Sequence, residues 1–142
     1  MTESGLRGKV PPNSIEAEKA TLGAILMSSS ALDTVTRYLG PDDFYKNANK
    51  KIYKAMQNLS AKSENVDTLT VIHELTGLGE LDAAGGAAYI TSLTSEVPTS
   101  ANVEYYAKVV QQYSIRRGLI ETSGEIAAGA MDDTMETGAV IE

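Results

Sequence analysis

The chain has 142 residues, the size of one domain. It has no cysteine, which excludes disulfides and thiolate metal sites, and a single histidine. We therefore expect neither a metal nor a cofactor. Its 12 basic and 19 acidic residues give a net charge of −7 at pH 7, which disfavours strong direct binding to nucleic acid because an acidic protein repels a phosphate backbone. No apolar run approaches the ~18 residues of a membrane helix and the N-terminus lacks a hydrophobic signal region, so we expect a cytoplasmic protein without membrane contact.

The first predicted helix follows a flexible arm. Residues 1–13 are polar, contain two glycines and end near a proline pair, and such termini are usually loosely held. Asn13 begins the pattern N-S-I-E, in which its side chain would cap a helix while Glu16 bonds back to the Asn13 amide. We therefore expect a helix over residues 14–27.

Glu18 does not fit the apolar stripe of this helix. At about 100° per residue it falls on the face that carries the apolar residues, which are Ile15, Leu22, Ile25 and Leu26. Such a carboxylate is a catalytic acid, an interior hydrogen-bonding group or part of a surface shared with a partner. Because an unpaired buried carboxylate is costly, we expect Glu18 to accept hydrogen bonds at the edge of the core.

Two further helices are predicted in the first half of the chain. Ser30 and Asp33 indicate the capped start of a short helix, which Gly40-Pro41 ends because proline cannot continue it. A longer helix is expected over residues 47–61, since apolar residues recur there at helical spacing, at positions Ile52, Met56 and Leu59.

The fourth and fifth helices are separated by a glycine-rich loop. Asp67 is expected to cap a helix that ends at Gly77 and that carries Leu69, Ile72 and Leu75. The loop LGELDAAGG then leads into a helix that carries Tyr89, Ile90 and Leu93, and EVPTS ends it. No strand alternation is long enough to predict a sheet, so the fold class is all-α.

The densest basic cluster lies on the predicted third helix. It consists of Lys46, Lys50, Lys51 and Lys54, with asparagines between them and Tyr45 and Tyr53 nearby. Such a cluster is usually a solvated helix face, and nucleic-acid binding is the less favoured alternative.

The last predicted helix, over about residues 100–130, has apolar residues on two opposite sides. Val103, Tyr106, Ala107, Val110 and Tyr113 form an inner stripe in its first half. In its second half the stripe moves to the other side, with Ile115, Leu119, Ile126 and Ala130. We expect the second half to leave the domain and present its stripe to a partner; a kink near Gly118 that keeps one core is the alternative.

The sequence contains no motif for catalysis. A phosphate-binding P-loop requires G-x-x-x-x-G-K-[ST], and the single Gly-Lys pair, at residues 8–9, is followed by valine. His73 has no second histidine at metal-binding spacing, and no nucleophile has an evident base. We therefore expect no enzymatic activity in this chain.

Four stretches in order, PPNSIEAEKATLGAIL, PDDFY, KIYKAM and GELDAAGGAAYITSLTSEVPTSANVEYYAKVV, resemble the N-terminal domain of replicative DNA helicases of the DnaB type over about residues 10–130. Asn49, where the family commonly has histidine, and Asn65, where it often has proline, are departures that we expect to affect packing alone. The resemblance implies a small orthogonal multi-helix head over residues 14–112. It also implies that residues 113–142 begin a helical hairpin whose second helix is truncated.

The same resemblance implies a function without catalysis. In this family the subunits pair through the hairpin within a hexameric ring, the head region docks primase, and a separate C-terminal ATPase domain, absent from this sequence, uses ATP and magnesium. Carried over by position, the partner-binding residues are Glu16, Tyr89, Ile120 and Ile126, to which the outer stripe adds Leu119. The alternatives are a stand-alone helical adaptor unrelated to replication and a small carboxylate-based helical enzyme.

Overall fold

The computed structural model describes residues 9–97 and 100–140. These residues form helices and connecting loops with no strand among them, which confirms the all-α prediction. In chain order the elements are α2 (Ile15–Met27), α3 (Ala31–Val35), the 3₁₀ helix η1 (Pro41–Asp43), α4 (Asn47–Ala61), α5 (Thr68–Gly77), α6 (Gly86–Ser92), the 3₁₀ helices η2 (Leu93–Glu96) and η3 (Ser100–Asn102), α7 (Val103–Met131) and α8 (Thr137–Val140).

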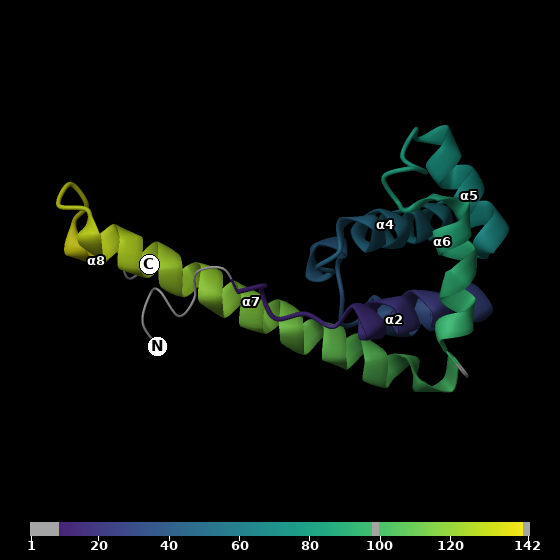
Figure 1. Cartoon of the computed structure of the whole chain (residues 1–142), viewed down its shortest axis with the longest axis horizontal. Helices are drawn as coiled ribbons and strands as arrows, with labels where there is room; N and C mark the ends of the chain where they lie inside the picture. Colours follow the sequence, from purple (N-terminus) through teal and green to yellow (C-terminus); the bar gives the residue numbers. More distant parts are fainter. Residues whose placement is uncertain (1–8, 98–99, 141–142) are drawn as a thin grey trace.

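The molecule has a helical head and a long projecting helix (Figure 1). In the head, α2 lies between α4 and the first half of α7, and α5 and α6 close the end remote from the projection. The second half of α7 extends away from the head and carries α8 at its tip. The head supplies the core, and the projection offers surface.

The core contains a contact of Phe44 with Tyr53, whose ring centroids are 5.0 Å apart. The Tyr53 hydroxyl donates a 2.8 Å hydrogen bond to the Leu39 carbonyl, so the phenol is satisfied although its side chain is fully buried. The same core cluster contains further apolar side chains from the head helices, including Leu22, Ile25, Ile52, Met56, Leu75, Ile90 and Leu93.

A glycine allows the closest helix contact in the head. At Gly23, on the buried face of α2, a Cβ atom would collide with the Leu93 carbonyl at the start of η2. Glycine is therefore required there by space, since the φ angle is an ordinary helical one.

The helix caps differ in part from the sequence prediction. Ser14, not Asn13, caps α2, and its hydroxyl accepts a 3.1 Å hydrogen bond from the Ala17 amide. Asn13 instead donates to the Pro11 carbonyl, so the expected Asn13–Glu16 capping box was wrong. Both residue types cap well, and the backbone selects the residue one position later.

The other two predicted caps have opposite outcomes. Ser30 precedes α3 but makes no side-chain cap, because its hydroxyl pairs with the Ser28 hydroxyl. At α5, the Asp67 carboxylate accepts from the Thr70 amide and the Thr70 hydroxyl accepts from the Asp67 amide. This confirms the cap at Asp67. The hydrogen bond from the Thr70 amide holds the pKa of the Asp67 carboxyl below its usual value.

The buried face of α5 is also shifted from the prediction. Val71 and Leu75 are fully buried, whereas Leu69 is 77% exposed. Val71 and Leu75, four positions apart, form the buried face of this helix. Leu69, which was predicted to lie on the same face as Leu75, lies outside it.

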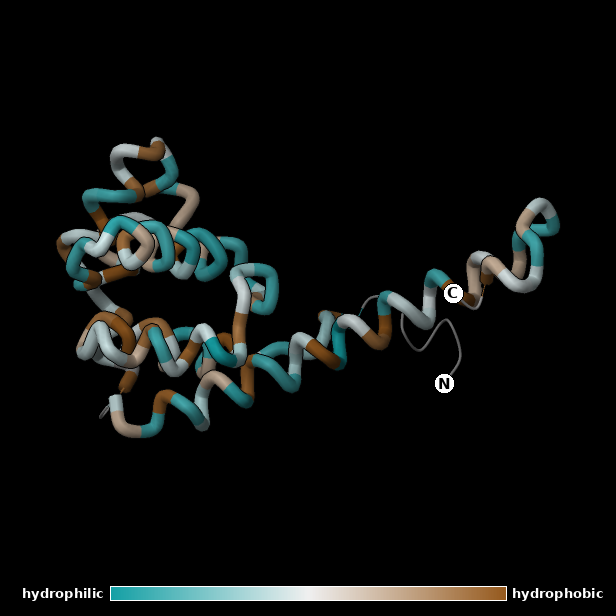
Figure 2. Tube along the Cα trace, turned by 180° about the vertical axis from the view of Figure 1, so that it is seen from behind, coloured by the Kyte–Doolittle hydropathy of each residue, from teal (hydrophilic) through white to brown (hydrophobic). Residues whose placement is uncertain are grey.

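The prediction of two opposite faces on the last helix is confirmed. Val103, Ala107 and Val110 are buried in the head, and Tyr38 donates a 2.6 Å hydrogen bond to Glu104 on the same half of α7. The helix continues without a break past Gly118, so the alternative of a kink there was wrong. The exposed apolar residues of the second half alternate with polar ones in Figure 2. These are Ile115, Leu119, Ile120, Ile126 and Met131.

Candidate partner-binding surface

Glu18, the residue that the helical wheel singled out, is fully built into the core. Its side chain is 1% exposed, and its two oxygens accept three hydrogen bonds. The donors are the amides of Tyr45 at 2.7 Å and Lys46 at 3.2 Å, and the side-chain amide of Asn49 at 2.9 Å. The predicted interior acceptor role is confirmed. The carboxylate fixes the loop that leads into α4.

Asn49 extends this network to the surface. It is fully buried in the first turn of α4, and its Oδ1 accepts a 2.6 Å hydrogen bond from the hydroxyl of Tyr89 on α6. One amide side chain therefore joins α2, α4 and α6. The expectation that Asn49 affects packing alone was incomplete. Its burial was not apparent from the sequence, because a polar stretch such as KNANKK is typical of an exposed segment.

Tyr89 presents its ring, not its hydroxyl, to the outside. The ring is half-buried, with the Lys46 ammonium 4.3 Å and the Lys19 ammonium 5.7 Å from its centroid. Gly85 lies beneath the ring at a φ of +93°, and a Cβ atom there would collide with Tyr89. The glycine loop and the Glu18–Asn49 network together hold this side chain in place.

Glu16 lies on the first turn of α2. It is exposed and lines a cleft of about 330 Å³ between α2 and α7. The α7 side of that cleft is formed by Tyr105, Tyr106 and Val109.

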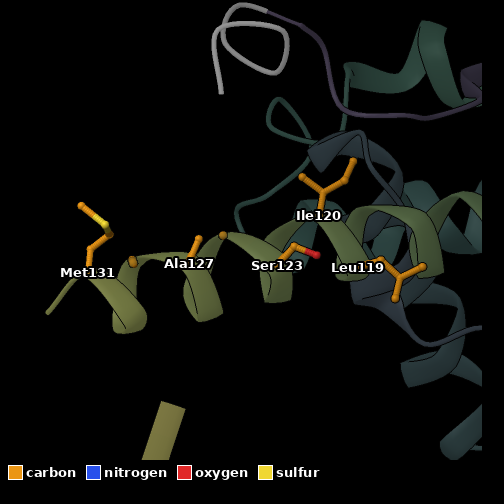
Figure 3. Close-up of a pocket in the computed structure, with 7 residues that line it drawn as sticks. Leu119, Ile120, Ser123, Ala127 and Met131 are labelled. Carbon is orange, nitrogen blue, oxygen red and sulfur yellow. The ribbon is translucent and has the colours of Figure 1, made fainter. Parts of the chain in front are cut away.

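The α7 residues of the predicted site are all exposed. The side chains of Leu119, Ile120 and Ile126 are 62%, 45% and 43% exposed. Leu119 and Ile120 line an open, mostly apolar groove of about 770 Å³ along the projecting half of the helix. Ile120, Ala127 and Met131 project from the same side of α7 there (Figure 3). Ile120 therefore lies outside the core.

A second cleft, which the sequence did not predict, joins Ile120 to the head. It measures about 790 Å³ and lies between residues 9–12, the turn at residues 42–45, Lys50 and α7. Arg117 holds it together by donating to the carbonyls of Pro12 at 2.9 Å and Asp43 at 2.7 Å, with its guanidinium 5.5 Å from the Tyr45 ring. Each of these two segments lies more than 70 positions from Arg117 in the sequence, so only the folded chain brings them into contact with this arginine.

The described residues contain no cluster of three or more potential metal ligands. None of the helices in residues 9–97 and 100–140 has the length and apolar character to span a membrane. The surface features are open, mixed clefts and an unpartnered helix face, which suit the binding of another protein.

The comparison with known proteins decides the family. The model of the DnaB-like helicase N-terminal domain matches residues 10–112. The chain belongs to this family. The DnaB-like domain is 42% identical over 137 residues to the replicative DNA helicase DnaB of Treponema pallidum, covering 96% of this chain and 31% of that protein. The chain therefore spans less than a third of the relative's length.

Solved structures of the family share the fold. The N-terminal domain of DnaB helicase from Mycobacterium tuberculosis superimposes with a TM-score of 0.88, at 34% identity and 93% coverage of both chains. A DnaB-like replicative helicase, solved with attention to its interactions with primase, matches with a TM-score of 0.70 at 26% identity. That match covers 81% of this chain and 27% of the helicase.

Proposed function

We propose that this chain is the non-catalytic collar domain of a cytoplasmic replicative helicase, in which it pairs subunits of the ring and docks primase. The ATP-dependent unwinding of DNA would belong to the rest of such a helicase. The main support is the projecting half of α7, roughly 27 Å long at 1.5 Å per residue, which carries exposed apolar side chains along its length.

The tip of the projection supports the pairing role. After Met131 the chain turns, and α8 packs back on α7, where Met135 and Val140 lie close to Gly129. This reversal supports our proposal that an antiparallel hairpin, the element that would pair subunits, begins here. We assign residues 14–112 to the head and residues 113–142 to the beginning of the hairpin.

The docking role rests on the relative that was solved with attention to primase and on the exposure of the proposed contact residues. Glu16, Tyr89, Leu119, Ile120 and Ile126 all have accessible side chains. They lie at three places, the start of α2, the face of α6 and the projecting half of α7, so one partner would have to span the head and the projection.

The test is a titration of the chain with the primase of the same organism by calorimetry, with self-association followed by sedimentation. Leu119→Asp should weaken one or both associations by a factor of about ten or more, as for an interface residue. Leu69→Asp, the same change at a leucine that is 77% exposed on α5, is the matched control and should leave both unchanged. Absence of both associations in the wild-type chain would exclude the proposed function in favour of an unrelated adaptor.

A further inference from the structure

Three lysines, one at the start of α4 and two within it, have no carboxylate partner among the residues that the structure describes. Among the residues that the structure describes, Lys51, Lys62 and Lys108 each pair with a glutamate. Within the same residues, Lys46, Lys50 and Lys54 make no such ion pair. They lie four positions apart, Lys46 directly before α4 and the other two within it. We call these three residues the lysine row.

The lysine row bridges two parts of the proposed partner surface that are otherwise separate. At one end, the Lys46 ammonium lies over the ring of Tyr89. In the middle, Lys50 lines the cleft of about 790 Å³ that also contains Ile120. Lys50 and Lys54, together with the paired Lys51, line a further cleft of about 450 Å³. A partner that contacts both Tyr89 and Ile120 therefore passes over the row.

From this we infer that the lysine row receives an acidic segment of the docked protein, with carboxylates placed against Lys46 and Lys50. The inference rests on the proposed docking function. Covering two unpaired ammonium groups with an apolar surface would be costly, because a buried charge without a partner loses its hydration. Carboxylates opposite the row remove that cost and also speed the encounter.

The geometry favours a protein segment over a nucleic-acid strand. Single-stranded nucleic acid is usually held by aromatic rings on which the bases stack. Here a cation lies over each candidate ring, Lys46 over Tyr89 and Arg117 over Tyr45. Asp42 and Glu121 line the same cleft as Lys50 and would repel a continuous chain of phosphates, whereas a peptide can place its carboxylates to avoid them.

The test compares two variants with the same change of net charge. Lys50→Glu combined with Lys54→Glu reverses two of the three charges of the row, and Lys62→Glu combined with Lys108→Glu reverses two lysines elsewhere. Each is titrated with primase at about 50 and 300 mM salt, where screening differs strongly, and thermal unfolding verifies that both fold. The row variant should bind about tenfold more weakly and lose its salt dependence, while the control variant should bind within about twofold of wild type.

Three outcomes would overturn the inference. If wild type and the row variant bind primase with equal affinity, no acidic segment contacts the lysine row, although the docking proposal is unaffected. Failure of wild type to bind primase removes both. Submicromolar binding of a fluorescent oligothymidylate that is lost in the row variant but kept in the control would show that the row recognises phosphate instead.

Discussion

The hydroxyl of Tyr89 donates a 2.6 Å hydrogen bond to the buried amide oxygen of Asn49, whose nitrogen in turn donates to Glu18. A residue of the proposed docking surface is thus oriented by a carboxylate in the core. Because each group in this chain has a defined donor or acceptor role, exchanging one donor for an acceptor should disturb the fold and the surface together.

Asn49→Asp is the change that tests this network. The variant keeps the shape of the side chain but replaces the amide that donates to Glu18 by a second carboxylate, so two like charges face each other in the core. We expect a loss of stability of about 2 kcal/mol or more, as for a buried group left without its partner. Asn47→Asp, exposed on the same first turn of α4, should change stability by less than about 0.5 kcal/mol. Urea unfolding of both variants gives the comparison, and equal stabilities would contradict the structural role of Asn49.

Gly23→Ala tests the close contact between α2 and η2. The added methyl group would collide with the Leu93 carbonyl, and backbone cannot move aside as a flexible side chain does. Overpacking of this kind usually costs about 1–3 kcal/mol. Gly118→Ala is the matched control, because it lies within α7 with open space around it and should stabilise the helix by about 0.5–1 kcal/mol. Thermal unfolding should therefore shift in opposite directions for the two variants.

Much of the fold was predictable because helical periodicity and capping residues are local signals. The wheel singled out Glu18, and the same argument separated the buried Val110 from the exposed Ile126 on one helix. Asn49 and Gly23 were not predictable, since their roles depend on Tyr89 and Leu93, 40 and 70 positions further along the chain. The cap of α2 was misplaced by one residue because Asn13 and Ser14 are both competent, and local sequence does not choose between them.

The candidate site was predictable only in part. Exposure of Leu119 and Ile126 follows from the change of face along α7, whereas Glu16, Tyr89 and Ile120 came from the resemblance. The role of Arg117 left no signal in the sequence, because its two carbonyl acceptors are distant backbone groups that any residue type can provide.

Alkaline pH should reveal the burial of Tyr53. Desolvation raises the pKa of its hydroxyl from 10.0 to about 12, so the folded state holds the proton more tightly than the unfolded state. The resulting stability is fully present below pH 10 and is lost as the pH rises through about 12. Tyr53→Phe should lose about 1 kcal/mol at neutral pH with the hydrogen bond to Leu39, but its remaining stability should fall less steeply between pH 10 and 12. Urea midpoints measured across this range test the difference in slope.

The two faces of α7 should respond differently to the same kind of substitution. Val110 is 2% exposed in the head, whereas Ile126 is 43% exposed on the projection. Full burial of a valine is worth roughly 1.5–3 kcal/mol, and a carboxylate in its place adds the cost of a buried charge, so Val110→Asp should severely destabilise the domain. Ile126→Asp should change stability by only about 0.5 kcal/mol while weakening primase binding or subunit pairing. Denaturant unfolding of both variants, with titration of the folded one against primase and against itself, separates the two roles. Equal destabilisation would mean that Ile126 belongs to the core, and the projecting helix would then lose its place as the partner surface.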